Sequence, residues 1–146
     1  MNYYNRINTE QNIFLTKIFE PEENSLEFEL ALGLISEQVE NLIINATDIG
    51  TSRRIYHDNE SEVFKVTFDN YIAYSVINES YENLGGSQYV GEKIRIYSKS
   101  NFLDYVKADT FATNEYPGGL KHYSFISQRH IVNVVSIMEP KIEKIK

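Results

Sequence analysis

The sequence contains no cysteine and no tryptophan, and only three prolines, among its 146 residues. Without cysteine there is no disulfide framework, no thiolate metal site and no cysteine nucleophile. No apolar run is long enough to span a bilayer, since Glu27 and Glu29 interrupt the densest one, at residues 26–35. The first residues also lack the basic and apolar regions of a secretory signal. These absences predict a cytoplasmic protein without membrane contact.

Basic residues are scarce in the first third of the chain. Residues 1–52 contain two bases, Arg6 and Lys17, against nine acids, which accounts for the whole formal net charge of −7. The remaining residues carry twelve bases and twelve acids. The clustered bases that would bind a phosphate backbone are missing, so no nucleic-acid partner is expected.

This uneven charge allows two interpretations. A solvated helix face is the simpler one, because most charge runs are solvated surfaces. The functional one is an acidic surface that docks on a basic protein and steers its approach. The residues of this predicted acidic binding surface are Glu20, Glu22, Glu23, Glu27, Glu29, Glu37 and Glu40.

The first 46 residues favour helix. Phe14, Leu15, Ile18 and Phe19 have helical spacing. Residues 26–34 fit both a helix and a strand, because their apolar side chains recur at every second position and also follow a helical face. The Leu, Glu and Ala content favours helix to about residue 45, and the strand alternative stays open.

After residue 46 the apolar period becomes two. It predicts strands at residues 47–57, 63–68, 71–79, 93–98, 121–127 and 130–136, and a short helix at 101–107 capped by Ser98 or Ser100. The predicted fold class is α+β, in one domain of residues 1–146. Residues 1–46 form a mainly helical layer, packed on a mostly antiparallel sheet (residues 47–140) with one short inserted helix. Residues 141–146 form a frayed tail.

Three stretches, residues 70–81, 96–105 and 122–136, together resemble a family of small uncharacterised bacterial proteins. The similar features are an Asn-Glu-Ser-Tyr strand end, a His-Tyr strand and a Val-Val-Ser strand. The resemblance covers roughly residues 47–142 and implies a one-domain organisation without an assigned activity. By analogy, small acidic bacterial proteins of this kind are often immunity proteins.

No sequence pattern identifies a reaction. The three histidines, His57, His122 and His130, lack the spacing of a metal site, and neither a nucleophile elbow nor a phosphate-binding loop is present. No cofactor or metal is expected. One polar cluster at a sheet end is the candidate pocket. Its carboxylate is a candidate acid or base, because a carboxylate beside aromatic rings can have a raised pKa. Its residues are Tyr74, Asn78, Glu79, Tyr81, His122 and Tyr123.

The sequence therefore predicts a non-enzymatic protein-binding protein, namely an immunity or inhibitor protein for a basic toxin. The alternative is a small-ligand-binding or enzymatic domain with a pocket near Glu79 and His122. For that cluster the simpler interpretation is ordinary loop-entry residues that bond the backbone. A third interpretation is a domain that self-associates through an exposed sheet face. The oligomeric state is not predicted.

Overall fold

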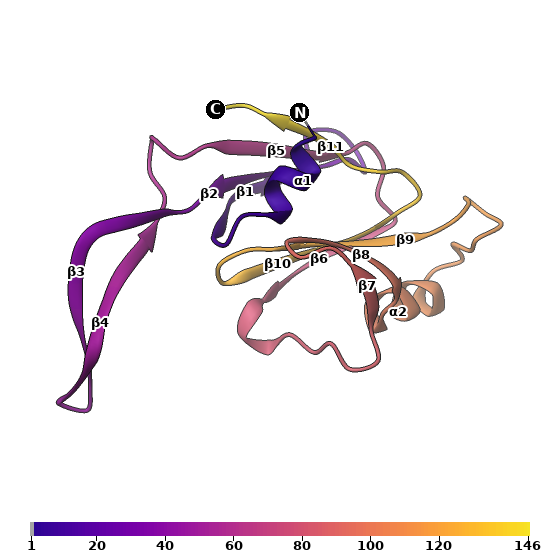
Figure 1. Cartoon of the computed structure of the whole chain (residues 1–146). Helices are drawn as coiled ribbons and strands as arrows, with labels where there is room; N and C mark the ends of the chain where they lie inside the picture. Colours follow the sequence, from indigo (N-terminus) through magenta and orange to yellow (C-terminus); the bar gives the residue numbers. More distant parts are fainter. Residues whose placement is uncertain (1) are drawn as a thin grey trace.

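The computed structural model describes residues 2–146, which form two antiparallel sheets, a projecting hairpin and two short α-helices (Figure 1). The helices are α1 (Tyr3–Asn8) and α2 (Asn101–Asp109), with a 3₁₀ turn, η1, at Glu79–Tyr81. The strands are β1 (Ile13–Phe19), β2 (Leu26–Leu32), β3 (Leu34–Ile44), β4 (Thr47–Tyr56), β5 (Val63–Phe68), β6 (Ala73–Asn78), β7 (Gln88–Val90), β8 (Ile94–Lys99), β9 (Lys121–Ile126), β10 (His130–Ser136) and β11 (Lys141–Lys144).

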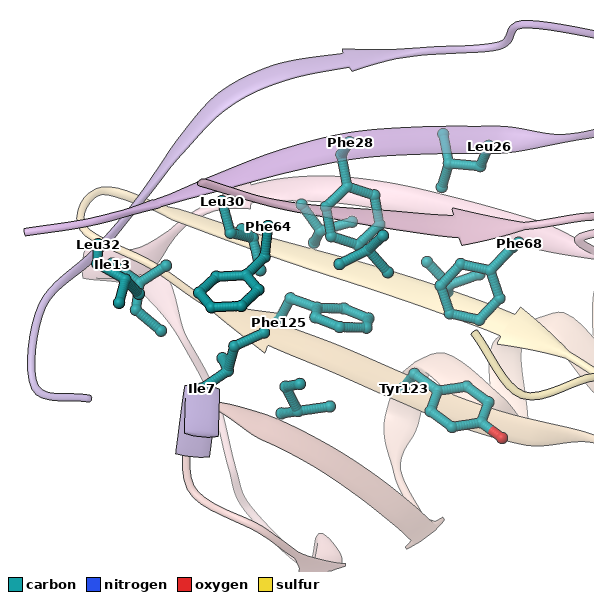
Figure 2. Close-up of a cluster of buried hydrophobic side chains, with 14 residues drawn as sticks. Ile7, Ile13, Leu26, Phe28, Leu30, Leu32, Phe64, Phe68, Tyr123 and Phe125 are labelled. Atoms are coloured by element: carbon teal, nitrogen blue, oxygen red, sulfur yellow. The ribbon is translucent and has the colours of Figure 1, made fainter. Parts of the chain in front are cut away.

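The core lies between a four-stranded sheet, β1-β2-β5-β11, and a five-stranded sheet, β6-β10-β9-β8-β7. Phe28 meets Phe125 across the gap with ring centroids 4.8 Å apart, and Phe68 meets Tyr123 at 5.5 Å (Figure 2). Helix α1 places the fully buried Ile7 in the same cluster. Two facing sheets with interdigitated aromatic rings form the usual core of a β-sandwich.

The predicted α+β class with a mainly helical layer at residues 1–46 is wrong, because the described chain is mostly antiparallel strand with two short α-helices. Residues 26–32 form β2, in which Leu26, Phe28 and Leu30 are buried while Glu27 and Glu29 alternate with them. The strand period was the correct one, because pairing with β1 and β5 and burial of one face outweigh the helix propensity of Leu, Glu and Ala.

The helical spacing at residues 14–19 comes from a β-bulge in β1. The register shifts between Leu15 and Lys17, so Leu15 pairs with Leu30 and Ile18 pairs with Phe28. One extra residue reverses the alternation of inward and outward side chains. A bulged strand therefore has apolar residues at a spacing that also fits one face of a helix.

The predicted strands from residue 47 onward and the helix capped by Ser100 are confirmed. The tail expected at residues 141–146 is instead ordered as β11, which pairs with β5 at the edge of the four-stranded sheet. Among residues 2–146 the structure has no helix with the length and apolar character needed to cross a membrane.

Candidate functional site

The hairpin of β3 and β4, called here the arm (residues 34–56), projects away from both sheets (Figure 1). It begins directly after Gly33, where a Cβ atom would lie only 2.7 Å from the Cβ of Asn12. The arm has no third strand and no covering layer within the described chain. Its large aliphatic side chains are about half exposed: Ile35 57%, Val39 53%, Leu42 43%, Ile43 60%, Ile44 52%, Ile49 54% and Ile55 41%.

Two local features shape the arm. Asn45 and Ala46 both have positive φ, at 50° and 62°, and connect the last strand pair, Ile44 and Thr47, as a two-residue type I′ turn. Arg53 donates from Nη1 to the carbonyls of Ser36 and Glu37, at 3.2 Å each, where the register of β3 shifts. The arm is thus a defined hairpin with an apolar surface.

A second candidate site is a buried polar network under α2, on the outer face of the five-stranded sheet. Ser100 Oγ lies 2.7 Å from His122 Nδ1, and His122 Nε2 lies 2.8 Å from Asn133 Oδ1. Ser124 also donates to Asn133 Oδ1. Because this amide oxygen can only accept, Nε2 carries the imidazole proton and Nδ1 accepts from Ser100.

The histidine of this network is held neutral. His122 is 3% exposed, and its ring stacks on Tyr97 with centroids 4.3 Å apart and meets the ring of Phe102 at 5.2 Å. Burial lowers the pKa of His122 from 6.5 to about 4, against a smaller opposing effect of its bond to Asn133. The Nδ1 lone pair is therefore free of a proton at neutral pH.

This network borders a pocket of about 370 Å³. The loop after β6 forms one wall and the first residues of α2 form another, while the sheet forms the floor. The carboxylate of Glu82 in this wall is ion-paired with Arg95, whose guanidinium lies 4.7 Å from the ring centroid of Tyr89. The lining residues include Ser75, Ile77, Tyr81, Leu84, Asn101 and Phe102.

The predicted pocket residues do not all meet. Tyr81 and His122 line this pocket together, whereas Tyr74 and Tyr123 pack against or within the core between the sheets. Asn78 caps η1 through Ser80 N, and Glu79 accepts the backbone N–H of Arg129 at 2.8 Å. Sequence reasoning saw Ser100 only as a helix cap and missed Asn133, which carries no pattern of its own.

The predicted acidic residues occupy three separate places. They lie in the β1–β2 loop (Glu20, Glu22, Glu23), on the outward side of β2 (Glu27, Glu29) and on the arm (Glu37, Glu40). In the loop, Glu20 accepts from the hydroxyl of Tyr71. Among residues 2–146, Glu22 and Glu23 have no ion pair.

The acids of β2 belong to a ladder of alternating charge. The strand register places Glu29 opposite Lys17 on one side and opposite Lys65 on the other, and Lys65 opposite Glu143. Lys65 Nζ lies 3.2 Å from Glu143 Oε2. Opposite charges directly across strands stabilise a sheet. The neighbouring lysines therefore neutralise part of the negative charge of these acids.

The described residues contain no group of three or more His, Asp or Glu side chains placed to hold a metal ion. His57 is exposed and contacts Phe14 with ring centroids 4.9 Å apart, and His130 is exposed at the start of β10.

Comparison with known proteins gives no family model, no curated protein and no solved structure that matches this chain.

Proposed function

We propose that this chain is a protein-binding protein, that the arm is its binding surface, and that the occupant of the arm is a second copy of the chain. The observation that carries this proposal is the run of seven half-exposed aliphatic side chains on a two-stranded hairpin. An isolated two-stranded hairpin is only marginally stable in water. A surface of this kind is expected to be covered in the working protein.

The unburied area is sufficient for a specific contact. Full burial of one such side chain stabilises by about 2 kcal/mol, so its exposed half retains about 1 kcal/mol. The seven retain on the order of 7 kcal/mol of hydrophobic free energy per arm before the costs of association, divided between the two faces of the hairpin because neighbours such as Ile43 and Ile44 point to opposite sides. In a symmetric dimer both arms contribute, because each surface is used twice.

The length of the arm supports a second copy as the occupant. β3 has 11 residues, or about 37 Å at the rise of an antiparallel strand, whereas β2 of the body has 7 residues and spans about 24 Å. One arm can therefore run along the whole sheet of a second body.

The charges of one chain are also complementary. Arg53 and Arg54 on the arm have no carboxylate partner among residues 2–146, and neither do Glu22 and Glu23 at the far end of β2. An arm that reaches this loop on a second copy pairs the two sets, and salt is expected to weaken that contribution.

The experiment is sedimentation of the whole chain over a range of protein and salt concentrations. We expect a dimer for the wild type and a monomer for the double variant Val39→Asp, Ile43→Asp. The matched control is Phe111→Asp, because Phe111 is 85% exposed and lies outside the arm; it should remain dimeric. A wild type that stays monomeric at high concentration would overturn the proposal.

The other candidate partner is a basic protein, and the oligomeric state of the wild type distinguishes it from self-association. The exposed Glu20, Glu22 and Glu23 favour it, whereas the charge ladder around Glu29 does not. If the wild type is monomeric and binds a cationic protein such as lysozyme in a salt-dependent way, an inhibitor or immunity role replaces self-association. Reversal of these three charges should then abolish that binding.

A further inference from the structure

We propose that Ser100 is a nucleophile that accepts the acyl group of a small uncharged carboxylic ester bound in the 370 Å³ pocket, with His122 as its base. This activity goes beyond protein binding by the arm and does not depend on it. It rests on the contacts of one hydroxyl group and on the pocket that this group borders.

Ser100 stands between β8 and α2, so its hydroxyl lies at the start of a helix. Its Oγ accepts the backbone N–H of Leu103 at 3.0 Å and donates to His122 Nδ1 at 2.7 Å. A hydroxyl oxygen has two lone pairs, so one remains for attack on a carbonyl carbon. The imidazole on the other side is fixed by Asn133, as in serine and cysteine hydrolases in which a third group orients the base.

The same helix supplies donors for a developing oxyanion. The backbone N–H groups of Asn101 and Phe102 have no acceptor among residues 2–146, and both residues line the pocket beside Ser100. They lie at the positive end of the dipole of the nine-residue α2. Free N–H groups next to a nucleophile stabilise the negative oxygen that forms during acyl transfer.

Asn133 provides a second observation of a ligand-binding surface. This residue is 8% exposed and lines the pocket. Its Oδ1 accepts hydrogen bonds from His122 Nε2 and from Ser124 Oγ. Its Nδ2 has no acceptor among residues 2–146. This nitrogen is not fully buried, so it can donate to an acceptor on a molecule in the pocket.

The lining of the pocket indicates the class of substrate. Glu82 is paired with Arg95, so no unpaired charge of the described lining faces the bound molecule. Ile77, Leu84 and Phe102 offer apolar surface for a short acyl chain. The free donors suit an acceptor oxygen on the ligand, and the carbonyl of an ester is one.

The reaction balances with water as the second reactant. Ser100 Oγ forms a bond to the carbonyl carbon while its proton passes to His122 Nδ1. The ester C–O bond then breaks, and the departing alkoxide takes that proton and leaves as an alcohol. Water attacks the acyl-serine in the second half, with its proton passing to His122 and then to Ser100 Oγ, which releases the carboxylic acid.

The experiment uses the whole chain with two probes, p-nitrophenyl butyrate as substrate and an alkyl fluorophosphonate as a covalent label. We expect release of p-nitrophenolate and one phosphonyl group, mapped by peptide mass spectrometry to Ser100. Ser100→Ala should lower the hydrolysis rate by roughly 100-fold or more. The matched control is Ser98→Ala, since Ser98 is exposed at the end of β8 and donates only to the carbonyl of Gln88; it should retain the wild-type rate.

Two results would overturn the proposal. One is a wild type that neither hydrolyses the ester nor takes up the label. The other is uptake of the label at any residue except Ser100. Because the label is mapped on the wild-type protein, the test stands even where loss of the α2 cap unfolds Ser100→Ala.

Discussion

Asn8 Oδ1 accepts the backbone N–H of Ile94 at 2.8 Å and so ties the end of α1 to the start of β8. The same oxygen accepts from Glu92 at 3.0 Å and from Lys93 at 2.9 Å. One side-chain oxygen thus binds three successive N–H groups, two in the loop before β8 and one at the first residue of β8. This contact holds α1, with its buried Ile7, between the two sheets.

Asn8→Ala should therefore destabilise the fold. Three N–H groups lose their acceptor and two of them are partly buried, so we expect a loss of about 2 kcal/mol in the free energy of unfolding. Urea denaturation measures it. The control is Asn5→Ala, because Asn5 is an exposed residue of the same helix. Equal stabilities of the two variants would contradict the role of Asn8.

Ala46→Gly should stabilise the arm. Ala46 has φ 62°, a left-handed conformation that costs an L-residue about 1 kcal/mol and costs glycine nothing. Asn-Gly is also the preferred pair for a type I′ turn. We expect slower hydrogen exchange at the amides of β3 and β4, with unchanged exchange in β9 and β10. Ala46→Val should do the reverse, and faster exchange in Ala46→Gly would refute the turn assignment.

The sequence predicted the second half of the fold better than the first, and the reason is local. In residues 121–136 both strands of a hairpin are adjacent and the apolar residues are β-branched or aromatic, so period and propensity agree. In residues 26–32 propensity favours helix, and pairing with β1 on one side and with β5 on the other decides for a strand. A single sequence does not contain that pairing.

The candidate sites show the same limit. His122 lies on a strand and Tyr81 follows a strand end, and the structure places both in the lining of one pocket. Ser100 and Asn133 meet His122 only through the register of β8, β9 and β10. The sequence did indicate the hairpin of the arm, because Ile43 and Ile44 lie before a turn and Ile49 lies after it. It did not indicate that these apolar side chains are exposed, because apolar residues are usually buried.

Tyr123→Phe should leave stability unchanged or raise it by up to about 1 kcal/mol. The hydroxyl of Tyr123 has no hydrogen-bond partner among residues 2–146, and burial raises the pKa of Tyr123 to about 12. Removing an unsatisfied buried hydroxyl removes its desolvation cost. The control is Tyr4→Phe, which deletes the bond from Tyr4 Oη to the carbonyl of Ile94 and should lose about 1 kcal/mol. A loss as large as that of Tyr4→Phe in thermal denaturation would contradict the assignment of the Tyr123 hydroxyl as unsatisfied.

His122 should make the fold sensitive to acid. The pKa of the buried imidazole is about 4, below the value of 6.5 in the unfolded chain. Well above pH 6.5 both states are neutral and the contribution of His122 to stability is complete. As the pH falls towards 4 the unfolded state binds a proton first, so stability is lost across this window, by about 3 kcal/mol in all. Urea denaturation of wild type and His122→Gln at pH 7.5, 6, 5 and 4 isolates this effect, because carboxylate protonation is common to both. The difference in unfolding free energy between the two proteins should shrink steadily as the pH falls, and a difference independent of pH would show that His122 is not held neutral.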